Sequence, residues 1–313
     1  MDDQVRLRWS VRRRLRLIEL RLYWGGKINR SDLVAFFGIS VPQASQDLTL
    51  YQSLAEGNLV YDKKERSYVA GPNFEPMFSD PSADGYLAQL RSLAMGALEP
   101  GESWIGSPPA FAGTPRIRRT YDRETLRRLL HAIRQKLLIR SRYASFSEDA
   151  PATRELAPHA FGFDGQRWHI RAFCHRSMGF RDFVIGRLSH VTLAGQSRIE
   201  PDWDVEWSRP VTMVLKPNPR LPERMRKAIE RDHRMSSGAL DVRTTICSSY
   251  YLESQLDLDI DPALLPPRRL QLVLANRQDL QRERQRAREE AAALITLKMP
   301  IPSTYAASGE PVR

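Results

Sequence analysis

Two stretches of sequence decide the fold in the middle of this chain: Arg167-Trp168-His169-Ile170-Arg171-Ala172-Phe173 and Arg181-Asp182-Phe183-Val184-Ile185-Gly186-Arg187. Side chains alternate in character along both stretches, as they do in β-strands. This parity separates His169 and Arg171, on one face of the first strand, from Trp168 on the other. On the second strand four side chains are expected to share a face unless a bulge intervenes, namely Arg181, Phe183, Ile185 and Arg187.

The arginines of these strands indicate a binding site for an anion. Guanidinium groups held on rigid strands suit planar anionic partners such as a phosphate, a nucleotide or a nucleic acid. The predicted effector-binding residues are Tyr143, Ser145, Arg154, His159, Trp168, His169, Arg171, Arg181 and Arg187. The alternative is a structural ion-pair network in which Asp164, Asp182 and Glu155 partner the arginines, because a buried arginine needs a partner.

The β-rich segment extends from Leu137 to about Leu193 and follows an amphipathic helix at Asp122–Gln135. Beyond it, alternating strands and helices predict a small α+β module. The expected elements of this module are strands at Val211–Leu215 and Ala239–Cys247 and helices at Pro222–Asp232, Tyr250–Leu258 and Leu280–Leu294. Ahead of the β-rich segment we expect a helix at Tyr86–Leu98 and a flexible, Pro/Gly/Ser-rich loop at Glu99–Pro115.

The N-terminal segment predicts a winged helix-turn-helix. The expected elements are helices at Arg6–Tyr23, Asp32–Phe37 and Val41–Leu54, and hairpin strands at Leu59–Tyr61 and Ser67–Val69. Ser40 is a suitable N-cap for the third helix, and Pro42 fits its first turn. Gly25-Gly26 and Gly38 supply the turns between the helices.

In such a domain the third helix enters the major groove, and basic side chains around it neutralise phosphates. The predicted DNA-binding residues are Arg12, Arg13, Arg30, Ser40, Gln43, Ser45, Gln46, Thr49, Lys63, Lys64 and Arg66. Glutamine suits the adenine edge, and serine or threonine suits several bases. The alternative is a helical protein-interaction domain whose basic face is solvated.

Composition limits the class of protein. The length of 313 residues suggests two or three domains, and the formal net charge of +11 favours a polyanionic partner.

The expected organisation is a winged helix at 1–72, a helical connector at 73–134, an effector domain at 135–208 and a C-terminal module at 209–313. The sequence has no apolar run of about 18 residues and no apolar leader, so we expect a cytoplasmic protein that makes no membrane contact.

Recognisable catalytic and metal-binding patterns are absent from the sequence. It has no HExxH, no Gly-rich phosphate loop and no GxSxG. Cys174 and Cys247 lack metal-ligand spacing and are expected to be buried thiols. We therefore expect no metal, no cofactor and no enzymatic activity. The alternative function is a nucleic-acid-processing accessory enzyme that binds single strands near His159 and Ser145.

Motifs across nearly the whole chain resemble the WYL-domain transcriptional regulators, and more narrowly the bacterial repressors beside anti-phage defence operons of the BREX and CBASS types. The tripeptide that names the domain falls at Trp168-His169-Ile170, where its tyrosine and leucine are replaced. The narrower group's Arg-Trp-His-apolar-Arg-Ala run is present at Arg167–Ala172. Further matches are Pro158-His159, Arg181-Asp182-Phe183, Arg187, Pro42–Leu48, Tyr61 and Pro217–Gly238.

The resemblance implies an α+β multidomain fold with an N-terminal winged helix-turn-helix, a central SH3-like β-barrel and a small C-terminal α+β extension. It also implies a homodimeric repressor of a phage-defence operon that binds an inverted repeat in double-stranded DNA. A nucleotide or nucleic-acid fragment in the barrel would release the operator. The residues that match the family's effector site are His159, Trp168, His169, Arg171, Arg181 and Arg187. The residues alone do not distinguish repression from activation.

Overall fold

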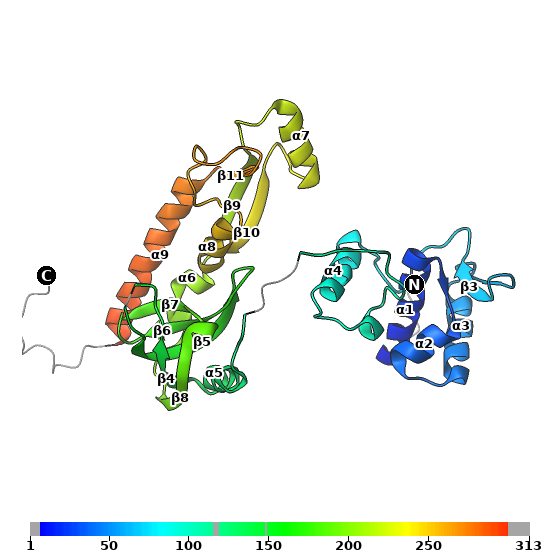
Figure 1. The fold of residues 1–313 in the computed structure, drawn as a ribbon, viewed down its shortest axis with the longest axis horizontal. Coiled ribbons are helices and arrows are strands. Elements are labelled where there is room, and N and C mark those ends of the chain that lie inside the picture. The colour runs from blue at the N-terminus through cyan, green and yellow to red at the C-terminus, as the bar shows by residue number, and fades with distance from the viewer. Residues whose placement is uncertain (1–6, 115–118, 148, 300–313) are drawn as a thin grey trace, which may run out of the picture. The chain divides into compact units, whose positions relative to one another are not determined.

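The computed structural model describes residues 7–114, 119–147 and 149–299 and divides the chain into two units, 1–118 and 119–313 (Figure 1). The first unit contains the predicted winged helix-turn-helix. Its elements are α1 (Trp9–Gly25), β1 (Lys27–Ile28), α2 (Arg30–Phe37), α3 (Val41–Leu54), β2 (Leu59–Asp62) and β3 (Ser67–Ala70). The strands pair antiparallel in the order β1-β3-β2, and the β2–β3 hairpin forms the wing. Arg6, the predicted first residue of the first helix, lies outside the described residues.

Local capping sets the ends of these helices. α1 and α2 each end at a glycine with positive φ, Gly26 at 72° and Gly38 at 64°, the left-handed conformation that closes a helix. α3 begins after Ser40, whose hydroxyl accepts a hydrogen bond from the backbone N–H of Gln43. α2 begins earlier than predicted because Asn29 and Asp32 form a capping box.

A buried carboxylate lies inside the core of the first unit. Glu19 has no exposed surface, and it accepts hydrogen bonds from the N–H groups of Met77 and Phe78, each at 2.7 Å. It also accepts from Ser79 Oγ at 2.9 Å and from Tyr51 Oη at 3.2 Å. Burial, and then the charge of Glu19, raises the pKa of Tyr51, so its hydroxyl remains a donor. The carboxylate ties the segment after the wing to α1 and α3.

Within the segment predicted as a flexible loop, residues 99–115, the stretch 103–106 packs into the first unit, whereas residues 107–114 are exposed. The segment begins with η1 (Pro100–Glu102), and Ser103 and Ile105 are buried. Trp104 packs on Tyr86 of α4 (Ala83–Ala94), so the first part of this segment has apolar partners that the composition did not indicate. This helix lies earlier in the chain than the predicted Tyr86–Leu98, because Ser82 caps it.

The second unit begins with a helix packed on a five-stranded antiparallel sheet. The elements are α5 (Arg123–Gln135), β4 (Leu137–Tyr143), β5 (Ala152–Phe163), β6 (Trp168–Cys174), β7 (Gly179–Val184) and β8 (Leu188–Gln196). Leu129 and Ala132 of α5 are fully buried against the sheet. The segment expected as a connector, 73–134, is therefore divided between the units: its first part belongs to the first unit and α5 to the second.

The sheet is strongly curled, in the way a small barrel requires. Its strand order is β7-β6-β5-β4-β8, so β7 and β8 are its opposite edges. In a flat sheet these edges would be four strand spacings apart, about 19 Å. Only η2 (Ile185–Arg187) joins Val184 to Leu188, and four residue steps span at most about 14 Å. The sheet must curl for its edges to meet at this turn.

The turn η2 lies within the predicted second strand, so this prediction was too long at its end. The strand was expected to continue to Arg187, with Ile185 and Arg187 on the face of Phe183. β7 ends at Val184 instead, and the 3₁₀ turn after it aims Ile185 into the core while Arg187 lies at the surface end of the turn. Closure of the curled sheet requires this tight turn, and the tight turn breaks the period of two on which the parity prediction rests.

The two faces of the sheet are covered by different elements. Ile170 and Ala172 of β6 face the core that includes α5. The opposite face, which carries Arg171 and Phe173, is covered by the segment that follows β8: Phe173 packs with Trp203 and with Ile295. Both faces of this central strand are therefore buried.

The C-terminal module has the predicted α+β character. Its elements are η3 (Pro201–Trp203), α6 (Val205–Ser208), β9 (Pro210–Pro217), α7 (Glu223–Asp232), β10 (Leu240–Thr245), α8 (Ile246–Gln255), β11 (Leu272–Leu274) and α9 (Arg277–Lys298). Its three strands pair in the order β10-β9-β11, and α9 runs from this sheet to the edge of the first one (Figure 1). The predicted strand at Ala239–Cys247 was too long at its end, because Thr245 caps α8 and places Cys247 in that helix.

Candidate functional sites

The predicted base-reading side chains of α3 differ in solvent exposure and in hydrogen bonding. Gln46 and Thr49 are exposed on the outer face of the helix. Gln43 is half-buried, and its Nε2 donates to Asp47 Oδ1 at 3.2 Å. Ser45 Oγ donates to the carbonyl of Val41 at 3.1 Å. The side chains of Gln46 and Thr49 are thus available to a partner, whereas those of Gln43 and Ser45 are already oriented by hydrogen bonds within the helix.

Basic side chains surround this helix at the surface. Arg12, Arg13 and Arg30 are exposed on α1 and α2, and Arg13 stacks on Trp9 with its guanidinium carbon 4.8 Å from the ring centroid. Lys63, Lys64 and Arg66 are exposed at the wing tip. Arg14, by contrast, is bound to buried Asp47, with Nε 2.6 Å from Oδ2. This ion pair locks α1 to α3 and fixes the angle at which α3 projects.

Arg171 is the centre of a buried network in the second unit, on the face of β6 that the C-terminal module covers. Only 4% of Arg171 is exposed. Its Nε and Nη2 bind the two oxygens of Asp204 at 2.7 and 2.9 Å, a bidentate geometry. Nη2 also donates to Glu206 at 3.0 Å, and Nη1 to Asp182 at 3.3 Å. His159 Nε2 hydrogen-bonds Asp204 Oδ2 at 2.9 Å.

The contacts of this network determine its ionisation. Burial alone would raise the pKa of Asp204, but the hydrogen bonds from Arg171 and His159 outweigh burial and lower it. Burial would lower the pKa of Arg171, and the carboxylates of Asp204 and Asp182 reverse this effect and raise it. Both groups are therefore charged at neutral pH, and each compensates the desolvation of the other.

The network connects the five-stranded sheet with the C-terminal module. Glu206, on α6, contacts Arg171 and also accepts from Tyr250 Oη at 3.4 Å and from Arg288 Nε at 3.2 Å. Cys247 Sγ lies 3.8 Å from Asp182 Oδ2. Burial, and then the charge of Asp182, raises the pKa of Cys247 to about 12, so this thiol stays protonated. Cys174 is also buried and free, and the prediction of two buried thiols is confirmed.

His169 belongs to a separate buried contact at the β5–β6 turn. Its Nε2 hydrogen-bonds Asp164 Oδ2 at 2.9 Å, and its ring lies 5.4 Å from that of Tyr251 on α8. Burial would raise the pKa of Asp164, but hydrogen bonds from His169, from the Gln166 N–H and from Arg167 lower it. This part of the predicted site serves to hold the hairpin against α8.

Three other predicted effector residues lie at exposed turns of the sheet: Trp168 where β6 begins, and Ser145 and Arg187 where β4 ends beside η2. Trp168 is 44% exposed and packs on Phe163, with ring centroids 4.9 Å apart. The guanidinium carbon of Arg187 lies 3.7 Å from the ring centroid of Phe146, which is 88% exposed. The Arg187 carbonyl accepts the N–H of Ala144, which places Ser145 in the same loop. Two aromatic contacts are thus presented to solvent, that of Trp168 with Phe163 and that of Arg187 with Phe146.

The remaining predicted residues lie elsewhere. Tyr143 is buried in the core, where its Oη accepts the N–H of Val184. Arg154 and Arg181 lie toward the opposite end of β6 from Trp168, because the register pairs Leu156 and Gly179 with Cys174. Arg181 is exposed and its Nε donates to Ser177 Oγ at 3.0 Å. The structure therefore distributes the predicted effector residues over the Arg171 network, the separate His169 contact, the core, exposed turns and two peripheral positions.

Several residues of these sites were not predicted. Asp204 and Glu206 complete the Arg171 network from the connector that follows β8. The sequence carries one signal that this connector is buried, namely its two tryptophans, Trp203 and Trp207. At the exposed end, Tyr121 was missed: its Oη accepts the Trp168 N–H at 3.3 Å. Its position just before a helix gave no indication of this contact.

Family comparisons match three consecutive segments of the chain. Residues 10–92 match the BrxR transcriptional regulator winged helix-turn-helix domain. Residues 124–193 match the WYL domain, and residues 210–280 match the BrxR transcriptional regulator C-terminal dimerization domain. These matches confirm the resemblance and the three-part fold derived from the sequence.

Curated relatives extend over most of the chain. A DNA-binding transcriptional repressor CapW of Stenotrophomonas maltophilia is 42% identical over 257 residues, which is 81% of this chain and 85% of that protein. The CapW of Pseudomonas aeruginosa is 40% identical and that of Escherichia coli 36%, each over 87% of this chain and 91% of the relative.

Solved structures give only distant likenesses. Proteasome accessory factor B/C of Arthrobacter aurescens aligns with a TM-score of 0.25 at 16% identity, over 90% of this chain and 49% of that one. A CRISPR Cas-related protein aligns with a TM-score of 0.28 at 12% identity, over 93% of this chain and 86% of that one. TM-scores this low do not define a shared fold.

Two further features bear on the class of protein. Among the residues that the structure describes, no group of three His, Cys, Asp or Glu side chains is placed to hold a metal ion. Within the same residues, no helix combines the length and the apolar composition that crossing a bilayer requires. His159 and Ser145, the pair considered for catalysis, have other partners: Asp204 and Ser147, respectively.

Proposed function

Because this chain belongs to the CapW family of DNA-binding transcriptional repressors, we propose that it is a homodimeric repressor released from an inverted-repeat operator by an anionic effector. The observation that carries the proposal is the similarity to CapW proteins, which are 36–42% identical over 81–87% of this chain. The exposed Gln46 and Thr49 on a rigidly held α3 support DNA reading by this helix. The site of action is the cytoplasm, where the operator DNA is accessible.

Binding to the duplex upstream of the protein's own gene tests this function. We expect a sequence-selective complex whose log affinity falls linearly with log salt, since each neutralised phosphate releases counterions. Equal, weak binding to every duplex would contradict the proposal and favour a general nucleic-acid-binding protein.

The reading helix gives a first prediction. Gln46→Ala is expected to reduce discrimination between operator and random duplex by about 1–3 kcal/mol, the value of a good bidentate base contact. Gln43→Ala is expected to have a smaller direct effect, because Gln43 is bound to Asp47. Fluorescence anisotropy with both duplexes measures the change. Gln52→Ala, on the last turn of α3, is the control for loss of a glutamine that holds the wing: its Nε2 donates to the Leu59 carbonyl at 3.3 Å. A Gln46→Ala variant that discriminates like the wild type would exclude α3 as the reading helix in this register.

We place the effector at the exposed end of the sheet formed by Trp168, Phe163, Phe146 and Arg187. Exposed rings accept stacked bases, and an adjacent guanidinium neutralises a phosphate, which together suit a nucleotide or a short single strand. The buried Arg171 network lies behind this end and is tied to the C-terminal module through Glu206. An effector that perturbs the exposed end can thereby change how the module is held, provided that it binds the two arrangements with different affinity.

The effector surface gives a second prediction. Trp168→Ala and Arg187→Ala are expected to bind operator normally but to need about tenfold or more of a single-stranded oligonucleotide for release, since a stacked base contributes about 1–3 kcal/mol. Arg181→Ala, toward the other end of β6, is the control. Competition anisotropy with a short oligonucleotide measures release. Normal release of both variants, or impairment of Arg181→Ala alone, would place the effector elsewhere.

The regulated genes belong to the same proposal. The matches to BrxR-type domains support an anti-phage defence operon as the target. Deletion of the gene is expected to raise transcription of the neighbouring operon. Unchanged transcript levels would contradict repression, and lower levels would indicate activation.

A further inference from the structure

The outer face of α7 carries a basic row of Arg224, Lys227 and Arg231, which Arg234 continues just beyond the helix. The three helical members lie within about 60° of one another around the helix axis, because they are three, four and seven positions apart. All four side chains are exposed, whereas Ile229, on the opposite side of the helix, joins the core of the module. The basic row is therefore a surface feature that plays no part in packing the module.

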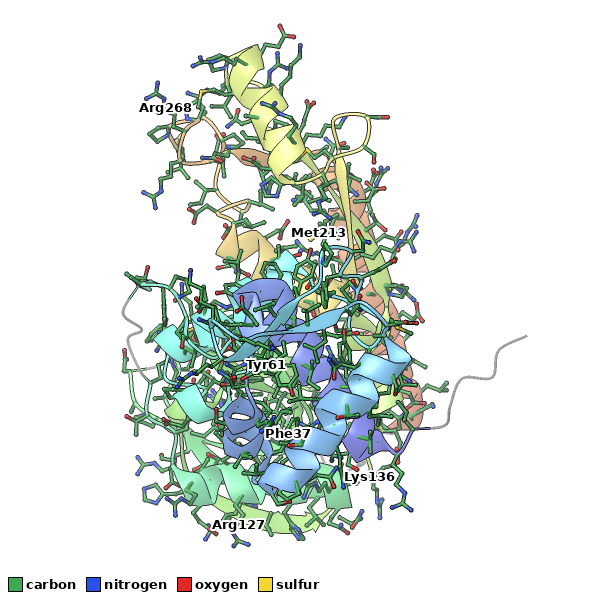
Figure 2. All side chains as sticks on the ribbon, turned by 90° about the vertical axis from the view of Figure 1, so that its right-hand side faces the viewer. Phe37, Tyr61, Arg127, Lys136, Met213 and Arg268 are labelled. Atoms are coloured by element: carbon green, nitrogen blue, oxygen red, sulfur yellow. The ribbon has the colours of Figure 1, made fainter. Side chains whose placement is uncertain are left out.

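The basic row borders an open hollow of about 740 Å³, whose remaining lining is Glu230 and the half-buried Met235. On the other side of Glu230 a second hollow of about 260 Å³ has Lys216 and Arg226 in its lining. The Nε of Arg226 is buried and has no hydrogen-bond partner among the described residues. Figure 2 labels Arg268 at the end of the module that also carries α7. Basic side chains thus extend from the outer face of α7 toward the sheet of the module.

The charges of α7 are compensated less than those of α9, the other charged helix of the module. The exposed Arg282 and Arg286 of α9 each pair with an acidic side chain three positions earlier. On α7 the ion pair that the described residues form joins Lys227 to Glu223 at 2.8 Å, and both side chains are more than two-thirds exposed. No carboxylate of the described residues lies within ion-pair distance of the arginines in the basic row. These arginines are therefore available to an anion from outside the chain.

The composition of the basic row favours phosphate groups that are repeated along a polymer. Arginine binds two oxygens of a phosphate at once. The distance along the helix axis from Arg224 to Arg231 is about 10 Å. Double-stranded DNA carries one negative charge per about 1.7 Å of its axis, so the row can face several phosphates.

The lining of the larger hollow also distinguishes between classes of polyanion. It contains no aromatic ring on which the bases of a single strand would stack. It contains no exposed apolar side chain that would enter a membrane surface. The backbone of a duplex, which offers phosphates and keeps its bases stacked inside, fits this lining best.

We propose that the basic row of α7 binds the sugar-phosphate backbone of double-stranded DNA, as a contact separate from that of the winged helix. Contacts to the backbone carry no sequence information, so this surface binds any duplex. The inference goes beyond the proposed function, because it assigns DNA binding to a segment that matches a dimerization domain.

The salt dependence of binding to a random-sequence duplex tests the proposal in the full-length chain. R224Q/R231Q removes two charges from the basic row, and R282Q/R286Q removes two charges from the paired arginines of α9 as the matched control. Each phosphate contact contributes about 0.9 to the slope of log affinity against log salt, so R224Q/R231Q is expected to flatten this slope by about 1.8. Between about 50 and 200 mM salt, the wild type and the control should lose about tenfold more affinity than R224Q/R231Q.

The basic row and the reading helix have different signatures in this measurement. R224Q/R231Q is expected to weaken binding to operator and to random duplex by the same factor, whereas Gln46→Ala lowers the preference for operator. Glu230→Gln is expected to strengthen binding to both duplexes, because it removes the carboxylate that lines the two hollows. A wild type without operator preference would contradict the proposed repressor and leave the test of α7 intact.

Photo-crosslinking detects the contact directly. Lys227→Cys can be labelled with a photoreactive maleimide, because the native thiols Cys174 and Cys247 are buried. The label is expected to crosslink to a random-sequence duplex. Arg142→Cys with the same label is the control, since Arg142 is exposed on β4, toward the opposite end of the second unit, and it is expected to crosslink far less.

The outcomes decide the proposal. A flatter slope for R224Q/R231Q than for R282Q/R286Q, together with preferential crosslinking from position 227, supports it. An unchanged slope, a change equal to that of the control, or crosslinking no greater than from position 142 overturns it. Native mass spectrometry and thermal unfolding are run on every variant. If R224Q/R231Q is folded but dissociates into monomers, the basic row belongs to a protein interface, and the proposal is overturned as well.

Discussion

Arg171→Ala is expected to destabilise the second unit by about 3–5 kcal/mol, the usual result of removing one partner of a buried ion pair. The substitution leaves Asp204, which is 1% exposed, without its bidentate partner and leaves Glu206 and Asp182 facing each other across the vacated space. Arg171→Lys is expected to recover little, because a single ammonium group cannot bind three carboxylates with the geometry of a guanidinium.

A double-mutant cycle measures this network. Arg171→Met and Asp204→Leu are each expected to be strongly destabilising, and the double variant less so than their sum, because each single change strands the other charge. Urea unfolding followed by hydrogen exchange in β6 and α6 isolates the second unit, since a two-unit chain does not unfold in one step. Exposed Arg140, paired with Glu155, is the control and is expected to change stability by less than about 1 kcal/mol. A stable, well-protected Arg171→Ala would show that the carboxylates do not depend on this arginine.

The stability of Arg171→Ala also tests whether Arg171 contacts an effector. If Arg171 contacted only an effector, its removal would leave the fold intact and abolish release alone. Its burial predicts instead that release and stability decline together, whereas Arg187→Ala affects release alone. Comparison of the two variants by melting and by operator release distinguishes a structural arginine from a contacting one.

Glu19→Ala is expected to destabilise the first unit by about 3–5 kcal/mol and to weaken operator binding with it. The N–H groups of Met77 and Phe78 lose a charged acceptor, and a hydrogen bond to a charged group contributes about 1.5–3 kcal/mol; the space left inside the core adds to this loss. Glu19→Gln keeps one acceptor oxygen and is expected to lose about half as much. The segment that follows the wing should then separate from α1.

Hydrogen exchange in α1 and α3, together with thermal unfolding, measures the effect of Glu19. Exposed Glu56 replaced by alanine is the control for loss of a carboxylate. If Glu19→Ala unfolds like the wild type, water must satisfy these donors in place of the carboxylate. Protection in β6 should remain unchanged in every Glu19 variant, because that strand belongs to the other unit.

Local patterns predicted the longer helices and strands better than the shortest strands or the element ends that depend on closure of the sheet. Helical spacing predicted α3 to the residue, because Ser40 and Pro42 define its start within a few positions of sequence. The predicted strand at Arg181–Arg187 was too long, because the tight turn η2 is imposed by closure of the sheet and not by the residues that form it. β11 was not predicted at all, since three residues give too little pattern for a strand.

The sequence by itself determined the three-part α+β architecture, the family and the residue types of both sites, because periodicity, capping and motifs act over short distances along the chain. Only the tertiary structure decided which predicted effector residues are buried. The alternation of side chains along β6 predicts that His169 and Arg171 share a face of the strand. It does not predict that Asp204 and Glu206 approach this face, because these residues lie more than thirty positions further along the chain. Charge partners so far apart in sequence are chosen by packing, and packing decides whether an arginine binds a ligand or stabilises a fold.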